Sequence, residues 1–230
     1  MSPAYARIAA ALKDQLDRLS AHTPLPSERE IGQSFGVSRM TARQAVSLLE
    51  SEGRVYRKPP RGTFVAEPRV RFHIGSFTEE VTRIGRHPQA TLLAASTQRA
   101  TSEQSQALGI PSNGRVHTLT RLRLADGEPL AIEHTVIPAR MAPDLLSKEL
   151  TGSIWRLLRD AFAVVPAIAN VVLECRSLDV RSARLLGLRE AAAGIVLTRT
   201  TTDEQGRCFE YAVDTYRADR AAFEFATDLR

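Results

Sequence analysis

Two arginines, Arg39 and Arg43, stand four residues apart near the start of a predicted helix. The helix is predicted over residues 38–51 because Ala45, Leu49 and other apolar residues recur there at helical spacing along one face. That pattern leaves Arg39 and Arg43 together on the exposed side of the helix. A guanidinium group can donate two parallel hydrogen bonds to O6 and N7 of guanine in the major groove of DNA. The pair is therefore typical of a helix that reads base edges.

Further polar residues near this pair could contact the same nucleic acid. The predicted helix carries hydroxyl and amide side chains that can reach phosphates or base edges, and the first turn of the preceding predicted helix offers an arginine and free N–H groups to a phosphate oxygen. At the tip of a predicted hairpin, Arg61 suits the minor groove because Gly62 permits close approach of the backbone. The candidate DNA-binding residues are Arg29, Ser38, Arg39, Thr41, Arg43, Gln44, Arg61, Gly62 and Thr63. Alternatively, these arginines only make a small helical domain soluble.

A second group, Arg121, Arg123 and Glu133, falls on two predicted strands joined by a turn at residues 126–127. Arg121 and Arg123 share one face because side chains alternate along a strand. A two-residue turn sends Glu133 to the opposite face, whereas a three-residue turn over residues 125–127 with a bulge puts all three side chains on one face. We favour the three-residue turn, since two arginines and a carboxylate together could hold a polar ligand. The alternative is an exposed sheet face whose ion pairs contribute little.

Three predicted helices and a hairpin position the first group. The second helix begins at Ser27, which has capping-box spacing to Glu30, and it ends at Gly36. Ser38 caps the third helix, and a two-stranded hairpin over residues 54–65 follows it. Two short helices joined by a tight turn and followed by a hairpin predict a winged helix-turn-helix.

The rest of the chain predicts strands alternating with helices, with a weak internal repeat. The first copy has strands at 116–124 and 130–136, and the second has strands at 195–200 and 208–213. Each copy contains a turn between its strands and a Leu-Gly motif before them. Two similar halves predict one antiparallel sheet with helices packed on it, which is an α+β domain.

Composition excludes several classes of protein. With 230 residues, of which 43% are hydrophobic, the chain can build cores, and its net charge of +5 is compatible with an anionic partner. Two cysteines rule out a disulfide framework. No apolar run approaches the roughly 18 residues of a membrane span, and the N-terminus does not resemble a signal peptide, so we expect a cytoplasmic protein. Neither metal-ligand spacing nor a catalytic motif is present, so we predict no metal, cofactor or catalytic residue.

Short motifs in the first block carry a family resemblance: Leu25-Pro-Ser-Glu-Arg-Glu30, Phe35-Gly-Val-Ser-Arg39, Thr41-Ala-Arg-Gln-Ala45 and Arg61-Gly-Thr-Phe-Val65. They resemble the winged helix-turn-helix of the GntR family of bacterial transcription regulators, over nearly all of residues 4–66. The resemblance implies that residues 1–66 bind operator DNA. One departure is Met40, where a small hydroxyl residue is common in the family.

Motifs in the second block carry a looser resemblance, among them Arg121-Leu-Arg123, Asp126-Gly-Glu-Pro129, Glu210-Tyr211 and Tyr216-Arg217. They are similar to the UTRA effector domain of the HutC subfamily. This resemblance implies a chorismate-lyase-like fold, binding of a small metabolite and dimerisation by residues 73–230, with residues 67–72 as a linker.

Matching the UTRA pattern position by position implies a set of effector contacts. A helix opening at Ser76 would offer free N–H groups to an anion near Arg121. Trp155 stands where tyrosine is frequent, so it keeps an aromatic contact without the hydroxyl. The implied effector-binding residues are Ser76, Phe77, Thr78, Arg121, Arg123, Glu133, Ser153, Trp155, Glu210 and Tyr216.

The favoured hypothesis is a homodimeric repressor that a small anionic metabolite releases from a palindromic double-stranded operator. The alternative is a chorismate-lyase-like enzyme with a fused DNA-binding domain, in which Glu133 or Glu210 would be the general acid or base. A third possibility is a DNA binder without any effector. The sequence does not identify the effector or the operator.

Overall fold

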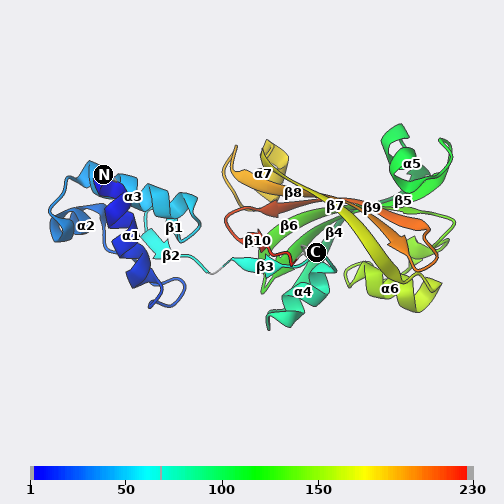
Figure 1. The fold of residues 1–230 in the computed structure, drawn as a ribbon, viewed down its shortest axis with the longest axis horizontal. Coiled ribbons are helices and arrows are strands. Elements are labelled where there is room, and N and C mark those ends of the chain that lie inside the picture. The colour runs from blue at the N-terminus through cyan, green and yellow to red at the C-terminus, as the bar shows by residue number, and fades with distance from the viewer. Residues whose placement is uncertain (1–2, 68, 227–230) are drawn as a thin grey trace. The chain divides into compact units, whose positions relative to one another are not determined.

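The chain folds into two compact units whose boundary along the chain falls between Arg69 and Val70, and a computed structural model describes residues 3–67 and 69–226 (Figure 1). Each unit has a hydrophobic core of its own. Within the described residues, no helix has the length and apolar character that crossing a membrane requires.

The first unit contains three helices and a hairpin. The helices are α1 (Ala4–Leu16), α2 (Glu28–Phe35) and α3 (Arg39–Ser51), and the hairpin strands β1 (Val55–Lys58) and β2 (Gly62–Val65) pair antiparallel. One apolar core joins all five elements. This is the winged helix-turn-helix that the sequence predicts.

Capping groups fix where α2 and α3 begin. Ser27 Oγ accepts from the Glu30 N–H at 3.3 Å, and Glu30 Oε2 accepts from the Ser27 N–H at 2.8 Å, so the predicted capping box is present. Gly36 ends α2 in the left-handed region with φ of 64°. Ser38 Oγ then accepts from the Thr41 N–H at 3.1 Å and caps α3. As a result, the arginine pair predicted from the sequence lies in the first turns of α3.

The second unit is built on a six-stranded antiparallel sheet. Its strand order is β4-β5-β6-β9-β8-β7. The strands are β4 (Pro88–Arg99), β5 (Arg115–Ala125), β6 (Glu128–Pro138), β7 (Pro166–Ser177), β8 (Ala193–Asp203) and β9 (Cys208–Arg217). The hairpins β5–β6 and β8–β9 are the two copies of the predicted repeat, and they meet where β6 pairs with β9. The outer strands β4 and β7 were not predicted from the sequence.

Helices cover both faces of this sheet (Figure 1). One face carries α4 (Phe77–Arg83), α6 (Ile154–Phe162) and the parallel strands β3 (Val70–Phe72) and β10 (Ala221–Phe223). The other face packs against α5 (Ser102–Leu108) and α7 (Val180–Leu185). A short 3₁₀ helix, η1 (Leu145–Ser147), precedes α6. The fold is the α+β arrangement expected from the sequence.

Strand β3 lies inside the segment that the sequence predicted to be a linker, residues 67–72. Val70 and Phe72 are buried, and the Phe72 ring lies 5.1 Å from that of Tyr216 and 5.8 Å from that of Phe223. Apolar side chains that alternate along a short strand are buried on one side of it, so this segment belongs to the core of the second unit.

The turn between β5 and β6 differs from the three-residue turn that we predicted. Ala125 pairs with Glu128, which leaves Asp126 and Gly127 as a two-residue turn, both with positive φ. A bulge follows close to the turn. Leu124 pairs with Pro129 but Arg123 pairs with Ala131, so β6 carries one extra residue, Leu130, and the register shifts there. The predicted turn was wrong, but the bulge produces the shared face that the prediction required.

Candidate functional site

The start of α3 presents the predicted arginine pair to solvent. Arg39, Arg43 and Gln44 are exposed, as is the capping residue Ser38, while Thr41 is half-buried. Arg39 pairs with Glu28, and 77% of its side chain is still accessible. The helix therefore offers two guanidinium groups one turn apart, with its N-terminal N–H groups beside them.

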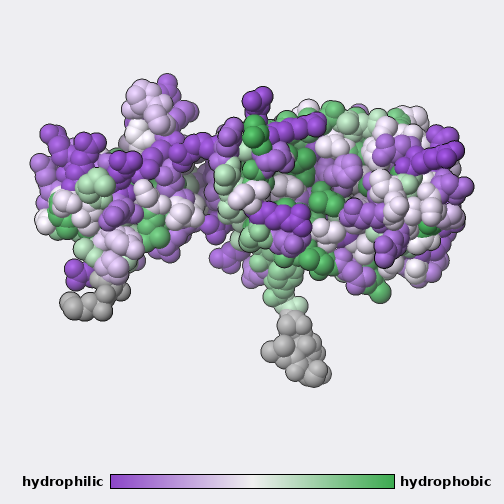
Figure 2. Space-filling view, turned by 90° about the horizontal axis from the view of Figure 1, so that it is seen from above, coloured by the Kyte–Doolittle hydropathy of each residue, from purple (hydrophilic) through white to green (hydrophobic). Residues whose placement is uncertain are grey.

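Two neighbouring segments add exposed donors. Arg29 is exposed in the first turn of α2. Arg61 and Gly62 are exposed at the hairpin tip, where Gly62 has φ of 114°, and Thr63 is half-buried. Hydrophilic residues predominate on the face of this unit that Figure 2 shows. These features suit contact with a phosphate backbone.

In the second unit, Arg121, Arg123 and Glu133 meet on one face of β5 and β6. Arg121 lies opposite Glu133 and donates from Nη2 to its Oε2 at 2.6 Å, and Arg123 donates from Nη1 to the same oxygen at 3.2 Å. The three residues are 4%, 2% and 7% exposed. Arg121 also donates to the carbonyl oxygens of Leu150 at 3.0 Å and Gly152 at 2.8 Å. The arginine thus joins the sheet to the segment that leads into α6.

The second hairpin adds an ion pair of the same kind. Arg199 of β8 donates from Nε to Glu210 Oε2 at 3.1 Å, and the Thr201 hydroxyl donates to that oxygen at 2.7 Å. Trp155 of α6 donates from Nε1 to both Glu210 oxygens at 3.1 Å. The Arg199 Cζ lies 4.9 Å from the centre of the Trp155 ring, within the range of a cation–π contact. Glu210 therefore fixes α6 against the sheet.

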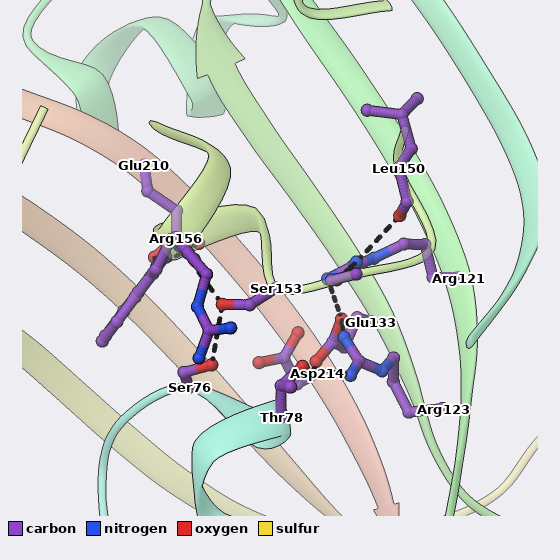
Figure 3. Close-up of polar contacts among 12 residues, drawn as sticks. Ser76, Thr78, Arg121, Arg123, Glu133, Leu150, Ser153, Arg156, Glu210 and Asp214 are labelled. Carbon is purple, nitrogen blue, oxygen red and sulfur yellow. Dashed lines mark hydrogen bonds and ion pairs between the residues drawn. The ribbon is translucent and has the colours of Figure 1, made fainter. Parts of the chain in front are cut away.

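Helices α4 and α6 both begin at this cluster (Figure 3). Ser76 directly precedes α4 without a capping hydrogen bond from its side chain, Ser153 Oγ caps α6, and the two Oγ atoms lie 3.2 Å apart. Ser153 Oγ also accepts from the Arg156 N–H at 3.2 Å. Arg123 donates from Nη2 to Thr78 Oγ1 at 2.8 Å. The arginines of the sheet thus contact the first turn of one helix and the approach to the other.

Two carboxyl groups face each other at the centre of the sheet. Glu133 of β6 and Asp214 of β9 are cross-strand partners, and both are buried. Burial raises the pKa of Glu133, but Arg121 and its neighbouring arginines outweigh burial, so the pKa lies below its ordinary value. Burial and the nearby carboxylates raise the pKa of Asp214 to about 8, although Arg199 opposes the shift. This shift favours the protonated form of Asp214 at neutral pH.

With Asp214 protonated, the cluster carries a net positive charge. Three guanidinium groups face the two carboxylates of Glu133 and Glu210, which accept hydrogen bonds from them, and a neutral Asp214. Among the described residues, Asp214 Oδ1 is buried without a hydrogen-bond partner. Such a site favours an anion, and it also holds one unused acceptor.

The space inside the cluster is small. Its side chains line a cavity of about 20 Å³, which is about the space for one water molecule. Pockets that bind metabolites are typically about 300–1,000 Å³. A metabolite could therefore bind here only if some of the lining side chains moved.

The structure brings the predicted effector residues together. Nine of them line the cavity: Ser76, Phe77, Arg121, Arg123, Glu133, Ser153, Trp155, Glu210 and Tyr216. The tenth, Thr78, reaches the cluster through Arg123. Sequence reasoning missed Arg199 and Asp214, which also line it. The internal repeat contained a signal for Arg199, because this residue stands in the second copy where the first copy has its arginines. Within residues 3–67 and 69–226, no three His, Cys, Asp or Glu side chains group as metal ligands would.

Two protein-family models match the chain. The model described as "Bacterial regulatory proteins, gntR family" matches residues 4–65, and that of the UTRA domain matches residues 83–222. Together they account for the helix-turn-helix unit and for most of the unit that contains the cavity.

Whole proteins of similar sequence and structure are also known. The chain is 36% identical to the HTH-type transcriptional repressor NagR of Bacillus subtilis (strain 168), over 96% of this chain and 93% of that protein. It is 31% identical to the HTH-type transcriptional repressor PhnF of Mycolicibacterium smegmatis, over 94% and 89% respectively. The crystal structure of PhnF from Mycobacterium smegmatis matches with a TM-score of 0.71 at 30% identity and covers 97% of this chain and 100% of that one.

Proposed function

Because the chain belongs to the GntR family of bacterial regulatory proteins and carries a UTRA domain, we propose that it is a homodimeric transcriptional repressor. In this proposal residues 1–66 bind a palindromic DNA operator, and residues 73–230 dimerise and bind a small anionic effector that releases the operator. Bacterial operator DNA lies in the cytoplasm, so we place the protein there.

The DNA-binding part of the proposal rests on the start of α3. A capped helix with exposed Arg39 and Arg43 can enter the major groove, where each guanidinium can donate to a guanine. Arg29 and Arg61 are exposed on flanking elements and would contact phosphates and the minor groove. Relatives that are named transcriptional repressors and align over nearly the whole chain support the same direction of control.

The effector part rests on the buried cluster, and this observation carries the proposal of a regulated repressor. Three arginines in the core with a net positive charge favour a phosphate, phosphonate or carboxylate. An entering anion would compete with Glu133 and Glu210 for these arginines. Arg123 contacts the first turn of α4, and Arg121 contacts the segment that leads into α6. The competition would therefore shift both helices, so that the effector-bound state differs in structure from the effector-free state.

The hydrogen bonds that hold the two candidate carboxylates disfavour the alternative of a fused enzyme. Glu133 and Glu210, the candidate acids or bases, each accept from arginine side chains, and Glu210 also accepts from Trp155 and Thr201. A carboxylate held this way is poorly suited to exchange a proton with a substrate. Incubation with chorismate followed by chromatography tests the alternative, and formation of 4-hydroxybenzoate and pyruvate would support it.

Salt-dependent DNA binding tests the main proposal. In the proposed dimer, two copies of the first unit each neutralise several DNA phosphates. Affinity for the operator should therefore fall roughly 10³-fold or more between 50 and 200 mM salt. Fluorescence anisotropy with duplexes selected from a random pool measures this dependence. Binding that does not change with salt, or a selection that yields no two-fold symmetric site, would contradict the proposal.

A further inference from the structure

A chain of ion pairs links the hairpin of the first unit to the exposed arginine at the start of α3. Glu50 Oε2 lies 3.1 Å from Arg57 Nη1, and Arg57 Nη2 lies 3.5 Å from Glu28 Oε1. The other oxygen of Glu28, Oε2, lies 3.5 Å from Arg39 Nε. Arg57 also donates to Ser47 Oγ at 3.1 Å. The two carboxylate oxygens of Glu28 thus each contact a different element.

Glu28 is held in place where Arg39 is not. As the first residue of α2, Glu28 has a backbone fixed by the capping box, and only 24% of its side chain is exposed. Arg39 is 77% exposed, and Glu28 is its ion-pair partner among the described residues. A long exposed side chain samples several rotamers, so one fixed carboxylate can bias which of them is populated.

The contact uses the Nε end of the Arg39 guanidinium. Guanine O6 and N7 accept from a pair of N–H groups on one edge of the guanidinium fork. Contact at Nε leaves the two Nη groups of Arg39 without a partner among the described residues. The carboxylate can therefore orient the arginine without occupying the groups that would meet a base.

We propose that Glu28 is a positioning residue that sets the base preference of Arg39, with Arg57 holding Glu28 in place from the hairpin. This inference rests on the proposed function, because it needs α3 to lie in the major groove. It assigns Glu28 a role that its charge alone disfavours. A carboxylate beside the DNA backbone repels phosphates and lowers affinity for every sequence.

Glu28 should lower the affinity for DNA of any sequence and raise the discrimination at one base, so a variant without its charge can separate the two effects. Loss of the negative charge should leave affinity for random-sequence DNA unchanged or higher. Loss of the orienting contact should lower discrimination at the one base that Arg39 reads. A residue that only stabilised the fold would lower both together.

The experiment uses the full chain and its E28Q variant, with E50Q as the matched control. Glu50 has a side chain of similar exposure, 21%, and also pairs with Arg57, at the opposite end of this chain of ion pairs from Arg39. Each protein selects duplexes from a random pool, and sequencing gives the base preference at every position. The position that loses its preference in R39A identifies the base that Arg39 reads.

We expect E28Q to lose roughly fivefold or more in preference at that position, since a good arginine–guanine pair discriminates by roughly 5- to 150-fold. E50Q should keep the wild-type preference, and the R39A/E28Q double variant should match R39A. An unchanged preference in E28Q overturns the proposal. So does an equal loss at all positions together with a lower melting temperature, because that result indicates a structural role. Failure of the wild-type chain to select any site would instead refute DNA reading itself.

Discussion

Replacement of Asp214 by asparagine should remove a pH dependence from the stability of the second unit. Asp214 lies at the centre of the sheet on β9, 1% exposed, opposite Glu133 and 3.7 Å from Arg199. Burial, together with Glu133 and Glu210, raises its pKa to about 8. The folded protein therefore holds a proton on this carboxyl at neutral pH, while the unfolded chain does not.

The sign and size of the effect follow from that shift. A carboxyl whose pKa is raised on folding stabilises the folded state below its unfolded pKa, and this contribution is lost as pH rises through the folded pKa. With a folded pKa of about 8 for Asp214, the free energy of unfolding should fall by about 1 kcal/mol between pH 7 and 8.5. Burial lowers the pKa of His117 and His134, and these residues affect stability only at lower pH.

The assay is urea unfolding followed by tryptophan fluorescence at pH 7, 7.75 and 8.5. Trp155 is the only tryptophan of the chain, and its indole contacts Glu210 inside the cluster, so its emission reports the second unit. The asparagine side chain of D214N would keep the shape of the neutral carboxyl without a titrating proton. In D214N the stability should therefore change less with pH than in the wild type. The raised pKa of the Cys208 thiol acts equally in both proteins and cancels in the difference.

Two results would refute this reasoning. Equal pH slopes in D214N and wild type would mean that Asp214 does not change its protonation in this range. A large loss of stability in D214N at pH 7 would mean that Asp214 is ionised there and pairs with Arg199, because removal of one partner of a buried ion pair costs about 3–5 kcal/mol.

The other expected outcomes concern the two proposed binding sites. R43A should relax base preference at one operator position at a cost of roughly 1–3 kcal/mol, whereas R29A should weaken binding to all sequences alike. Sequencing of the duplexes that each variant selects separates these two effects. Identical base preferences in R43A and R29A would contradict our placement of α3. R121K and E133Q should fold and bind the operator but lose most of the response to effector, since a charge-assisted contact of roughly 1.5–3 kcal/mol is as large as a typical coupling of about 1–3 kcal/mol. Operator affinity with and without saturating effector measures this, and a normal response in both variants would move the pocket elsewhere. We choose conservative replacements because Glu133 accepts hydrogen bonds from two buried arginines.

The fold of the first unit could be predicted almost entirely from local signals. Ser27, Glu30, Gly36 and Ser38 fix two helix starts and one end through contacts between residues no more than four apart, and such contacts are visible in the sequence. The ion pair between Glu28 and Arg39 was not predicted. It joins two helices across the turn and depends on their packing angle.

The cluster in the second unit was predicted in part, and the reason lies in its construction. Arg121, Arg123 and Glu133 belong to one hairpin. The alternation of side chains along each strand, together with the bulge, decides on which face of the sheet each of them lies. Arg199 and Asp214 come from the other hairpin and join the site because β6 pairs with β9. That pairing links residues about 80 positions apart, and the alternation within one strand carries no information about it. The outer strands β4 and β7 escaped prediction because none of their residues is fully buried, and because β7 carries exposed apolar residues such as Ile168 and Val172 beside the half-buried ones.

The pairing of β6 with β9 also gives the proposed pocket its sensitivity to charge. Glu133 keeps a low pKa because nearby arginines pair with it, and its charge helps to keep its neighbour Asp214 protonated. An effector anion that drew Arg121 away from Glu133 would add negative charge to the cluster and make ionisation of Asp214 still less favourable. Binding and protonation therefore favour each other in this cluster. It follows that a rise in pH through 8 should weaken an anionic effector, because ionised Asp214 would cancel the net positive charge.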